Sequence, residues 1–382
     1  MSGRDRRALV LYLHSSSGRY GADRQLELLV GGLDPDRYRP IVALPAGELA
    51  DRLRAAGTEV MERAPAAIRR GVGSPRGLAA LTAALARDAA ALTTLIRRRQ
   101  ITLVHSNTSV LLGGAAAAGL ARVPHVWHVR EIYSRFVRIW PAYRRLLLTA
   151  AALPCVSEAT AAQFGGDRRA RVIYDGLAID AHRAPRKQAR SALGLDADAP
   201  VVAVLGRISD WKGQDLLVRA LAEPALRDRG AIGLLAGEAW PGAQVRRDRV
   251  VSLARELGVG DRLRLSGFVD DVDTVYGAAD VVAVPSTAPD PLPNAAIEAA
   301  AAGCAVVAAD HGGLPEILSD GCTGRLFGPG DAGALARIVR ELLDDDSQRR
   351  RLGAAAAADV RGRFAAARHL EQIQSLYDAV RA

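Results

Sequence analysis

Two acidic residues, separated by a proline-broken loop, mark the stretch with the clearest potential for chemistry. Asp290 and Glu298 have seven residues between them, and an alanine-rich run follows. Pro293 suits the first turn of a helix, because its missing N–H would have no partner inside that helix. Glu298 would then lie about one turn into the helix, with Asp290 in the loop before it. Since the free N–H groups of a first turn bind anions, the stretch predicts a site for a phosphate or a sugar.

A second stretch places two cations after an apolar run at 201–205. Gly206 and Arg207 begin it, and Lys212 ends it just before a predicted helix. Only two of the 51 basic residues are lysines, Lys187 and Lys212, so a compact ammonium at this position is unusual for this chain. An arginine fork and a lysine point charge together can hold a diphosphate. The alternative is a surface loop that carries two cations by chance.

Glycines and histidines at the ends of other predicted strands add to the possible site. Gly312 and Gly313 follow an apolar run and would let a ligand approach the backbone closely, although such a pair is often only a turn. Gly21 follows the first strand without the spacing of a dinucleotide fingerprint, which argues against an NAD enzyme. His128 could hydrogen-bond a substrate or serve a structural purpose, whereas His105 is expected to be structural. Nothing in the sequence predicts a metal site.

Strand-like and helix-like patterns alternate along the chain, which predicts an α/β protein with two Rossmann-like, doubly wound domains. Strands are expected at 8–14, 40–44, 58–61, 101–105, 124–128, 153–156 and 172–174, and then at 201–205, 232–235, 262–265, 280–284, 305–308 and 324–327. The polar stretch 180–200 predicts the interdomain linker. We therefore expect an N-terminal domain at 1–180, a C-terminal domain at 181–365 and a final helix at 366–382. Ligands of such folds bind at the carboxyl ends of the strands, so the domains should face each other across a cleft.

Charged residues are unevenly distributed along the 382-residue chain. Residues 1–180 hold 26 arginines and 15 acids, a net charge of +11, whereas the remainder has a net charge of −2. The basic half suggests an anionic partner such as a membrane surface or a phosphate-bearing acceptor, or a solvated surface in an arginine-rich protein. Nucleic acid is not expected, because aromatic residues are sparse and no binding motif is present. The segment 135–145 mixes bases with aromatics and could dock on an anionic membrane, or it could pack its apolar side inward.

Cysteine usage and hydropathy bear on location. The three cysteines are widely spaced, which favours reduced thiols in a cytoplasm. No apolar run is expected to cross a bilayer, and the N-terminus has no secretory pattern. We therefore expect a cytoplasmic protein, which could also associate with the inner face of the membrane.

Taken together, these motifs resemble the retaining glycosyltransferases of glycosyltransferase family 4, which have the GT-B architecture. The resemblance covers the whole chain and is strongest from Val201 to Phe327. The motifs occur there in the family's order: 206–213, 266–268, 279–286, the acid pair with 298–303, and 312–316. The first acid of the family is usually glutamate, and here it is Asp290, which is one methylene shorter.

The resemblance implies a role for each matching residue. Arg207 and Lys212 would neutralise the diphosphate of a nucleoside diphosphate sugar, Glu298 would bind the ribose and Asp290 the transferred sugar. Other residues are implied to bind the donor or line its pocket: Gly21, Gly206, Gly267, Phe268, Val269, Leu292, Pro293, Asn294, Gly312 and Gly313. His128 matches a histidine that contacts the sugar. The helix at 366–382 is implied to pack back on the N-terminal domain.

The implied activity is transfer of a sugar to an acceptor hydroxyl, in cell-surface glycan or natural-product assembly. The resemblance also implies retention of anomeric configuration and no metal or other cofactor. The acceptor is open; a lipid-linked or anionic one would suit the basic half. Three alternatives remain: a nucleotide-sugar 2-epimerase, a non-catalytic binder of sugar nucleotides, and a phosphorylase, which would need a pyridoxal phosphate on one of the two lysines.

Overall fold

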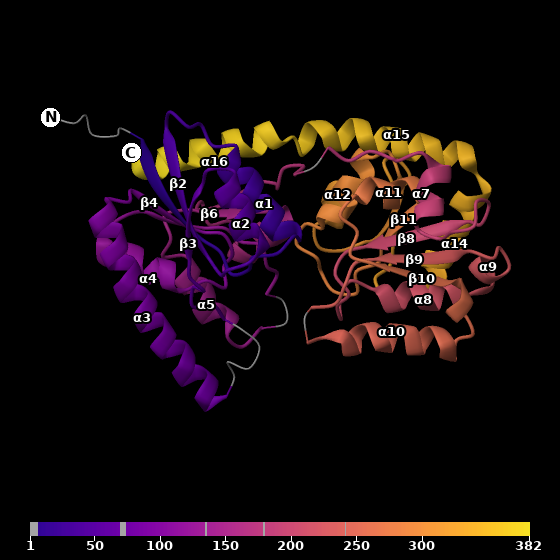
Figure 1. Cartoon of the computed structure of the whole chain (residues 1–382), viewed down its shortest axis with the longest axis horizontal. Coiled ribbons are helices and arrows are strands. Elements are labelled where there is room, and N and C mark those ends of the chain that lie inside the picture. The colour runs from indigo at the N-terminus through magenta and orange to yellow at the C-terminus, as the bar shows by residue number, and fades with distance from the viewer. Residues whose placement is uncertain (1–6, 69–73, 134–135, 179, 241) are drawn as a thin grey trace. The chain divides into compact units, whose positions relative to one another are not determined.

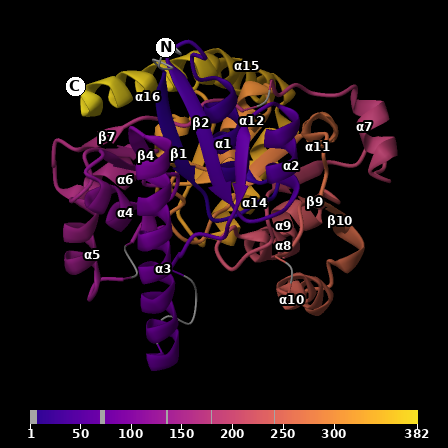
Figure 2. The ribbon, with the colours of Figure 1, turned by 60° about the vertical axis from the view of Figure 1, so that its left-hand side comes forward.

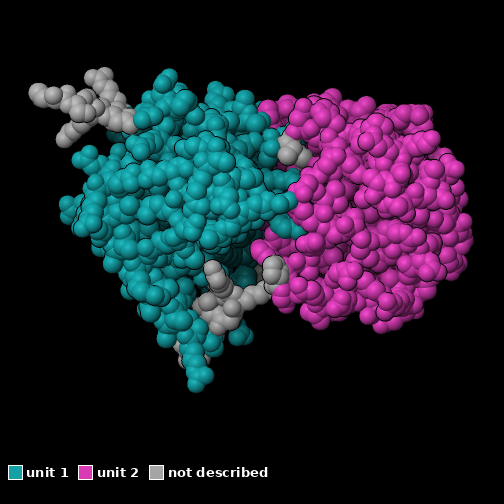
Figure 3. Space-filling view, viewed as in Figure 1, with its two compact units in different colours: residues 1–178, 366–382 teal, residues 179–365 magenta. Residues whose placement is uncertain are grey.

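The computed structural model of the chain describes residues 7–68, 74–133, 136–178, 180–240 and 242–382. These residues form two compact units. Unit 1 consists of residues 1–178 and 366–382, and unit 2 of residues 179–365 (Figure 3). Unit 1 is therefore built from two segments that are far apart in the sequence, because residues 179–365, which form unit 2, separate them along the chain.

Unit 1 contains a five-stranded parallel sheet in the order β3-β2-β1-β4-β5. Its strands are β1 (Ala8–Leu13), β2 (Tyr38–Leu44), β3 (Glu59–Glu62), β4 (Leu103–Ser106) and β5 (His125–Trp127). Two further strands, β6 (Leu153–Cys155) and β7 (Ala170–Val172), pair with each other. Isolated parallel bridges, Val126 to Ala152 and Val129 to Cys155, join them to the chain around β5.

Helices cover both faces of this sheet (Figures 1 and 2). They are α1 (Gly21–Gly31), α2 (Glu48–Ala55), α3 (Pro75–Arg99), α4 (Gly113–Ala121), α5 (Trp140–Leu147), α6 (Glu158–Ala161), η1 (Ala162–Phe164) and α16 (Ala366–Arg381). Successive side chains of a strand point to opposite faces. Val10 and Tyr12 therefore pack with α1, α2 and α16, whereas Leu11 and Leu13 pack with α3 and α4.

Helix α3 corrects one expectation from the sequence. Within the described residues it is the one helix that is long and apolar enough, by length and composition, to cross a membrane, at Arg76–Arg99. This is weak evidence for a span, because core helices of other proteins pass the same test. Leu92 and Ile96 belong to the core, and Asp88 accepts a bond of 2.5 Å from Arg63, so one side of the helix is held within unit 1.

Unit 2 contains a six-stranded parallel sheet in the order β10-β9-β8-β11-β12-β13. Its strands are β8 (Val201–Leu205), β9 (Ile232–Ala236), β10 (Leu263–Gly267), β11 (Val281–Val284), β12 (Ala305–Ala309) and β13 (Arg325–Phe327). The chain winds one way through β8, β9 and β10 and then returns to β11 on the other side of β8. Loops after β8 and β11 therefore meet at the switch point, where such folds bind ligands.

The helices of unit 2 lie on both sides of its sheet, with α8 and α10 on one side and α11 and α12 on the other (Figure 1). They are α7 (Arg186–Ala192), α8 (Gln214–Ala222), α9 (Pro224–Arg227), α10 (Gln244–Glu256), η2 (Gly260–Arg262), α11 (Val272–Ala278), α12 (Asn294–Ala301), α13 (Leu314–Ile317), α14 (Ala332–Asp344) and α15 (Asp346–Arg363). Both units are thus doubly wound α/β folds, which confirms the predicted fold class.

The predicted linker at 180–200 is wrong. This stretch belongs to unit 2, and the division of the chain falls at residues 178 and 179. Its helix α7 packs on α11, and Arg190, which is 1% exposed, forms an ion pair of 2.9 Å with Asp280. Burial lowers the pKa of Arg190. Arg190 is one of the polar residues that suggested a linker, but its charge is buried and its ion pair with Asp280 holds the start of unit 2 in place.

Candidate functional site

An ion pair joins the loops after β8 and β11. Lys212 Nζ lies 2.6 Å from Asp290 Oδ2, and both side chains are largely buried, at 24% and 8% exposed. The Ser286 hydroxyl lies 3.4 Å from the same carboxylate oxygen. The loops are also joined through their backbones, because the N–H of Thr287 donates to the Trp211 carbonyl at 2.8 Å. The structure therefore brings together the predicted diphosphate-binding lysine and the predicted sugar-binding acid.

A glycine allows these two loops to touch. Gly213 has a φ of +74°, a conformation that favours glycine, and it lies against Pro285. A Cβ atom at this position would stand 1.8 Å from the Pro285 carbonyl oxygen. Only a residue without a side chain fits, so the contact of the two backbones requires a glycine at position 213.

The loop after β12 closes the site from a third direction. The N–H of Gly313 donates to the Asp290 carbonyl at 2.8 Å. A Cβ at Gly312 would lie 2.3 Å from that same oxygen, and one at Gly313 would lie 2.1 Å from the Pro291 carbonyl. His311 hydrogen-bonds the Ser286 carbonyl through Nε2 at 2.7 Å. Asp290 is thus held by its backbone and its side chain, and the predicted glycine pair makes the close approach possible.

Helix α12 begins one residue later than expected. Pro293 occupies the N-cap with φ −74° and ψ 109°, rather than the first turn, and Asn294 starts the helix. Leu292 and Pro293 are buried, and Asn294 is half-buried. Among the described residues no side chain caps the start of α12, so its first N–H groups can serve an anion or a sugar hydroxyl.

Glu298 lies one turn inside α12, as predicted, and is only 7% exposed. Its carboxylate accepts a hydrogen bond from the Tyr276 hydroxyl on α11 at 3.2 Å.

We expect Glu298→Gln, which keeps the shape but removes the charge, to raise the KM for a sugar nucleotide about tenfold, because hydrogen bonds to a charged acceptor are worth about 1.5–3 kcal/mol. Steady-state kinetics with varied donor measures this. Tyr276→Phe is the matched control, and an equal rise in KM for it would place the effect in the protein contact rather than in ribose binding.

The predicted base-binding end of the site lies where β8, β9 and β10 finish. The N–H of Gly206 donates to the Ala236 carbonyl at 2.9 Å, and the N–H of Gly237 donates to the Gly267 carbonyl at 2.7 Å. Phe268 and Val269 follow and are half-buried. Arg207 lies beside these strand ends with its guanidinium 3.1 Å from the centre of the Trp240 ring. Trp240 has no motif around it, so the sequence alone did not indicate it.

Two predicted site residues, His128 and Gly21, belong to unit 1. Gly21 begins α1. His128 follows β5, is fully buried, and neither ring nitrogen has a hydrogen-bond partner among the described residues. Burial, together with the Arg130 guanidinium, holds the pKa of His128 well below its usual value. The imidazole is therefore neutral and can act as donor or acceptor. His105, expected to be structural, bonds Tyr377 through Nδ1 at 2.5 Å.

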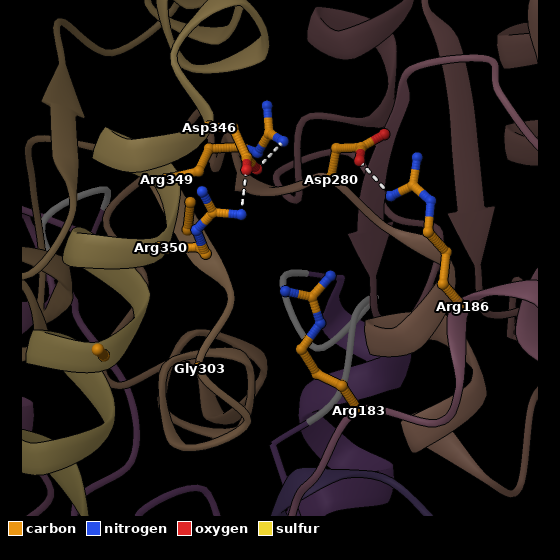
Figure 4. A pocket seen from close by; sticks show the side chains of 9 residues that line it. Arg183, Arg186, Asp280, Gly303, Asp346, Arg349 and Arg350 are labelled. Atoms are coloured by element: carbon orange, nitrogen blue, oxygen red, sulfur yellow. Dashed lines mark hydrogen bonds and ion pairs between the residues drawn. The ribbon is translucent and has the colours of Figure 1, made fainter.

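A cavity in unit 2 lies apart from these predicted site residues. It measures about 420 Å³ and is lined mainly by charged side chains (Figure 4): Arg183, Arg186, Asp280, Asp346, Arg349 and Arg350. Asp280 precedes β11, so this cavity lies at the amino edge of the sheet, opposite the Lys212–Asp290 pair. Three of its arginines form ion pairs, Arg186 with Asp280 at 2.5 Å and Arg349 and Arg350 with Asp346. Arg183 donates a hydrogen bond to the Ala279 carbonyl at 2.8 Å. It is therefore separate from the predicted site.

In the parts of the chain that the structure describes, no three His, Cys, Asp or Glu side chains come together in a group able to hold a metal ion. Arg207 and Lys212 are the cations that the sequence assigned to the predicted site. Both lie in the loop after β8.

Sequence comparisons match both halves of the chain. A model described as Glycosyltransferase Family 4 matches residues 20–181, and one described as Glycosyl transferases group 1 matches residues 185–359. The D-inositol 3-phosphate glycosyltransferase of Nocardia farcinica is 38% identical over 223 residues, which are 56% of this chain and 49% of that protein. Its counterpart in Corynebacterium diphtheriae is 37% identical over 198 residues, 50% of this chain and 45% of that protein. The chain spans about half the length of these curated relatives.

A solved structure resembles nearly the whole chain. The crystal structure of Anabaena HepE in complex with UDP and glucose has a TM-score of 0.81 and 28% identity, and the match covers 97% of this chain and 99% of that one. The two doubly wound units and this resemblance place the chain in the GT-B class of glycosyltransferases. Together with the two sequence matches, this shows that the chain belongs to glycosyltransferase family 4.

Proposed function

We propose that this protein is a retaining glycosyltransferase that moves a sugar from a nucleoside diphosphate sugar to an acceptor hydroxyl. The observation that carries the proposal is the Lys212–Asp290 pair, held where the loops after β8, β11 and β12 meet. A cation for phosphate and an acid for sugar hydroxyls lie there side by side. The names of the relatives support the same activity, and Anabaena HepE binds UDP-glucose.

The proposed chemistry breaks the bond between the anomeric carbon and the β-phosphate oxygen, and forms one from that carbon to the acceptor oxygen. Most of the barrier lies in the charge that grows on the leaving diphosphate. Arg207, Lys212 and the start of α12 are fixed donors that would stabilise it without a metal. The acceptor proton would pass to the leaving phosphate, which fits attack on the same face and retention. Asp290 would orient the sugar and Glu298 the ribose.

The shorter side chain of Asp290 is compatible with this role. Gly312 and Gly313 bring a neighbouring loop into direct contact with the backbone at Asp290 and Pro291. Lys212 fixes one carboxylate oxygen. A rigidly placed carboxylate needs less reach than a mobile one, because the pocket is shaped around it.

One experiment separates this function from its rivals. UDP-, GDP-, ADP- and dTDP-sugars are screened by thermal shift, and nucleotide release is then followed with acceptors, D-inositol 3-phosphate first, with and without EDTA. Acceptor-dependent release that survives EDTA, with retained configuration in the product, supports the proposal. Conversion of the donor without an acceptor would mean an epimerase. Stabilisation without any turnover would mean a binding protein.

An exposed apolar surface on unit 1 supports a peripheral contact with an anionic membrane, which we propose as part of this function. Phe136, Val137 and Ile139, just before α5, and Leu146 on α5 are 52%, 75%, 62% and 40% exposed. Arg138 and Arg145 are exposed in the same segment; Arg135 lies outside the described residues. Other apolar side chains do pack inward, with Trp140 stacked on Tyr133 and Leu147 buried. The segment thus offers both apolar anchors and cations.

We expect Ile139→Asp to weaken binding to vesicles of anionic lipid about tenfold, since it removes an exposed anchor and adds a charge of the wrong sign. Sedimentation with anionic and with neutral vesicles measures this. Val245→Asp is the matched control, because Val245 in unit 2 is also 62% exposed. If the wild type binds neutral vesicles as well as anionic ones, or binds neither kind, the result contradicts a location at the inner face of the membrane.

A further inference from the structure

The strand pair β8–β9 continues past its ends and places an aromatic ring beside Arg207. Ile208 and Ala239 form a parallel bridge, and the N–H of Ile208 donates to the Glu238 carbonyl at 3.0 Å. Side chains alternate between the faces of such a pair. Arg207 and Trp240, one residue on either side of the bridge, therefore project to the same face. This register allows the two side chains to meet, and the Arg207 guanidinium carbon lies 3.1 Å from the centre of the Trp240 ring.

Trp240 is 47% exposed, which is unusual for a ring of its size. The guanidinium carbon of Arg207 lies over its indole, 3.1 Å from the centre of the ring. Stacking uses the face of a guanidinium, whereas its N–H groups lie in the plane and point outward from the edge. A stacked arginine can therefore still donate from its edge to phosphate oxygens.

We infer that Trp240 is a positioning residue that holds the Arg207 fork ready for the donor diphosphate. An arginine side chain otherwise loses much rotamer freedom when it binds a ligand, and a ring that orders it beforehand reduces that loss. The inference rests on the proposed function, because it takes the partner of Arg207 to be a diphosphate. Trp240 acts through Arg207 and touches no reacting atom.

The test is a double-mutant cycle on nucleotide affinity. UDP binding is measured by calorimetry for the wild type, Trp240→Ala, Arg207→Ala and the double variant, with GDP, ADP and dTDP in parallel. We expect Trp240→Ala to weaken binding of the preferred nucleotide about tenfold in the wild type and less than twofold in the Arg207→Ala background. Trp240→Phe, which keeps an aromatic face, should restore most of the affinity.

Two further measurements separate positioning from folding. Val245→Ala is the control, because Val245 is also an exposed apolar residue and lies on α10, which follows Trp240 in the chain. This variant should bind the nucleotide as the wild type does. The melting temperature of Trp240→Ala should equal that of the wild type, because half of the ring is in solvent.

The outcomes are distinguishable. A tenfold loss of nucleotide affinity for Trp240→Ala in both backgrounds would mean that the ring contacts the nucleotide directly. Unchanged affinity would mean that the ring has no role. Either outcome overturns this inference and leaves the proposed function standing. A wild type that binds none of the four nucleotides overturns the proposed function and this inference with it.

Discussion

Lys212→Ala should lower kcat/KM for the sugar nucleotide about a hundredfold, because removing one fixed charge from a developing phosphate costs about 3 kcal/mol. Lys212 also neutralises Asp290, whose side chain is 8% exposed. Its removal therefore leaves a buried carboxylate without its ammonium partner, and the variant should lose about 1–3 kcal/mol of unfolding free energy as well. Steady-state kinetics and urea unfolding measure the two effects.

The chain provides its own control for this prediction. Lys187, the other of its two lysines, is exposed on α7. Lys187→Ala removes the same charge and should change neither turnover nor stability, since exposed charges contribute little. Equal turnover of Lys212→Ala and the wild type would contradict the assignment of this loop to the diphosphate.

Gly213→Ala should destabilise unit 2 by about 3 kcal/mol or more, because both the backbone conformation and the space at this position exclude a side chain. The added Cβ would stand 1.8 Å from the Pro285 carbonyl oxygen at a φ of +74°. The loops after β8 and β11 would have to separate, and this would pull Lys212 away from Asp290. We therefore expect activity to fall together with stability, as measured by urea unfolding and by sugar transfer.

Gly230→Ala separates the clash from the strain of the backbone. Gly230 has a similar φ of +64°, and a Cβ atom added there would meet nothing within 4 Å. The substitution should cost only about 1 kcal/mol, the penalty for a side chain in the left-handed region. If the two variants are equally stable, the contact between Gly213 and Pro285 does not hold the loops together.

Strand-end positions were the part of the fold that could be predicted from the sequence. Each site motif follows an apolar run, and parallel strands place their carboxyl ends at one edge. The resemblance implied that Lys212 and Asp290 serve one donor pocket, but their direct ion pair could not be predicted, because it depends on β11 lying beside β8 rather than beside β10. Strand order is set by packing over the whole sheet and leaves no mark in the residues near either loop.

Contacts made through single residues could not be predicted either. Trp240, Tyr276 and His311 lie beside the predicted residues, but each is isolated in the sequence and has no spacing pattern. Arg190 was placed in a linker for a related reason, since a buried ion pair and a solvated charge look alike in sequence. The start of α12 differed by one residue because a proline suits either the N-cap or the first turn.

The composition of unit 1 has a consequence for how the chain folds during synthesis. Ile373, Leu376 and Tyr377 of α16 belong to the same core as β1 and β2, although residues 179–365 separate them. The ribosome therefore completes unit 2, a continuous stretch, before it supplies the helix that covers one face of the first sheet. Until α16 emerges, apolar residues such as Tyr12 and Val42 lack part of their cover. The half of the protein that is made first is thus the half that can finish folding last.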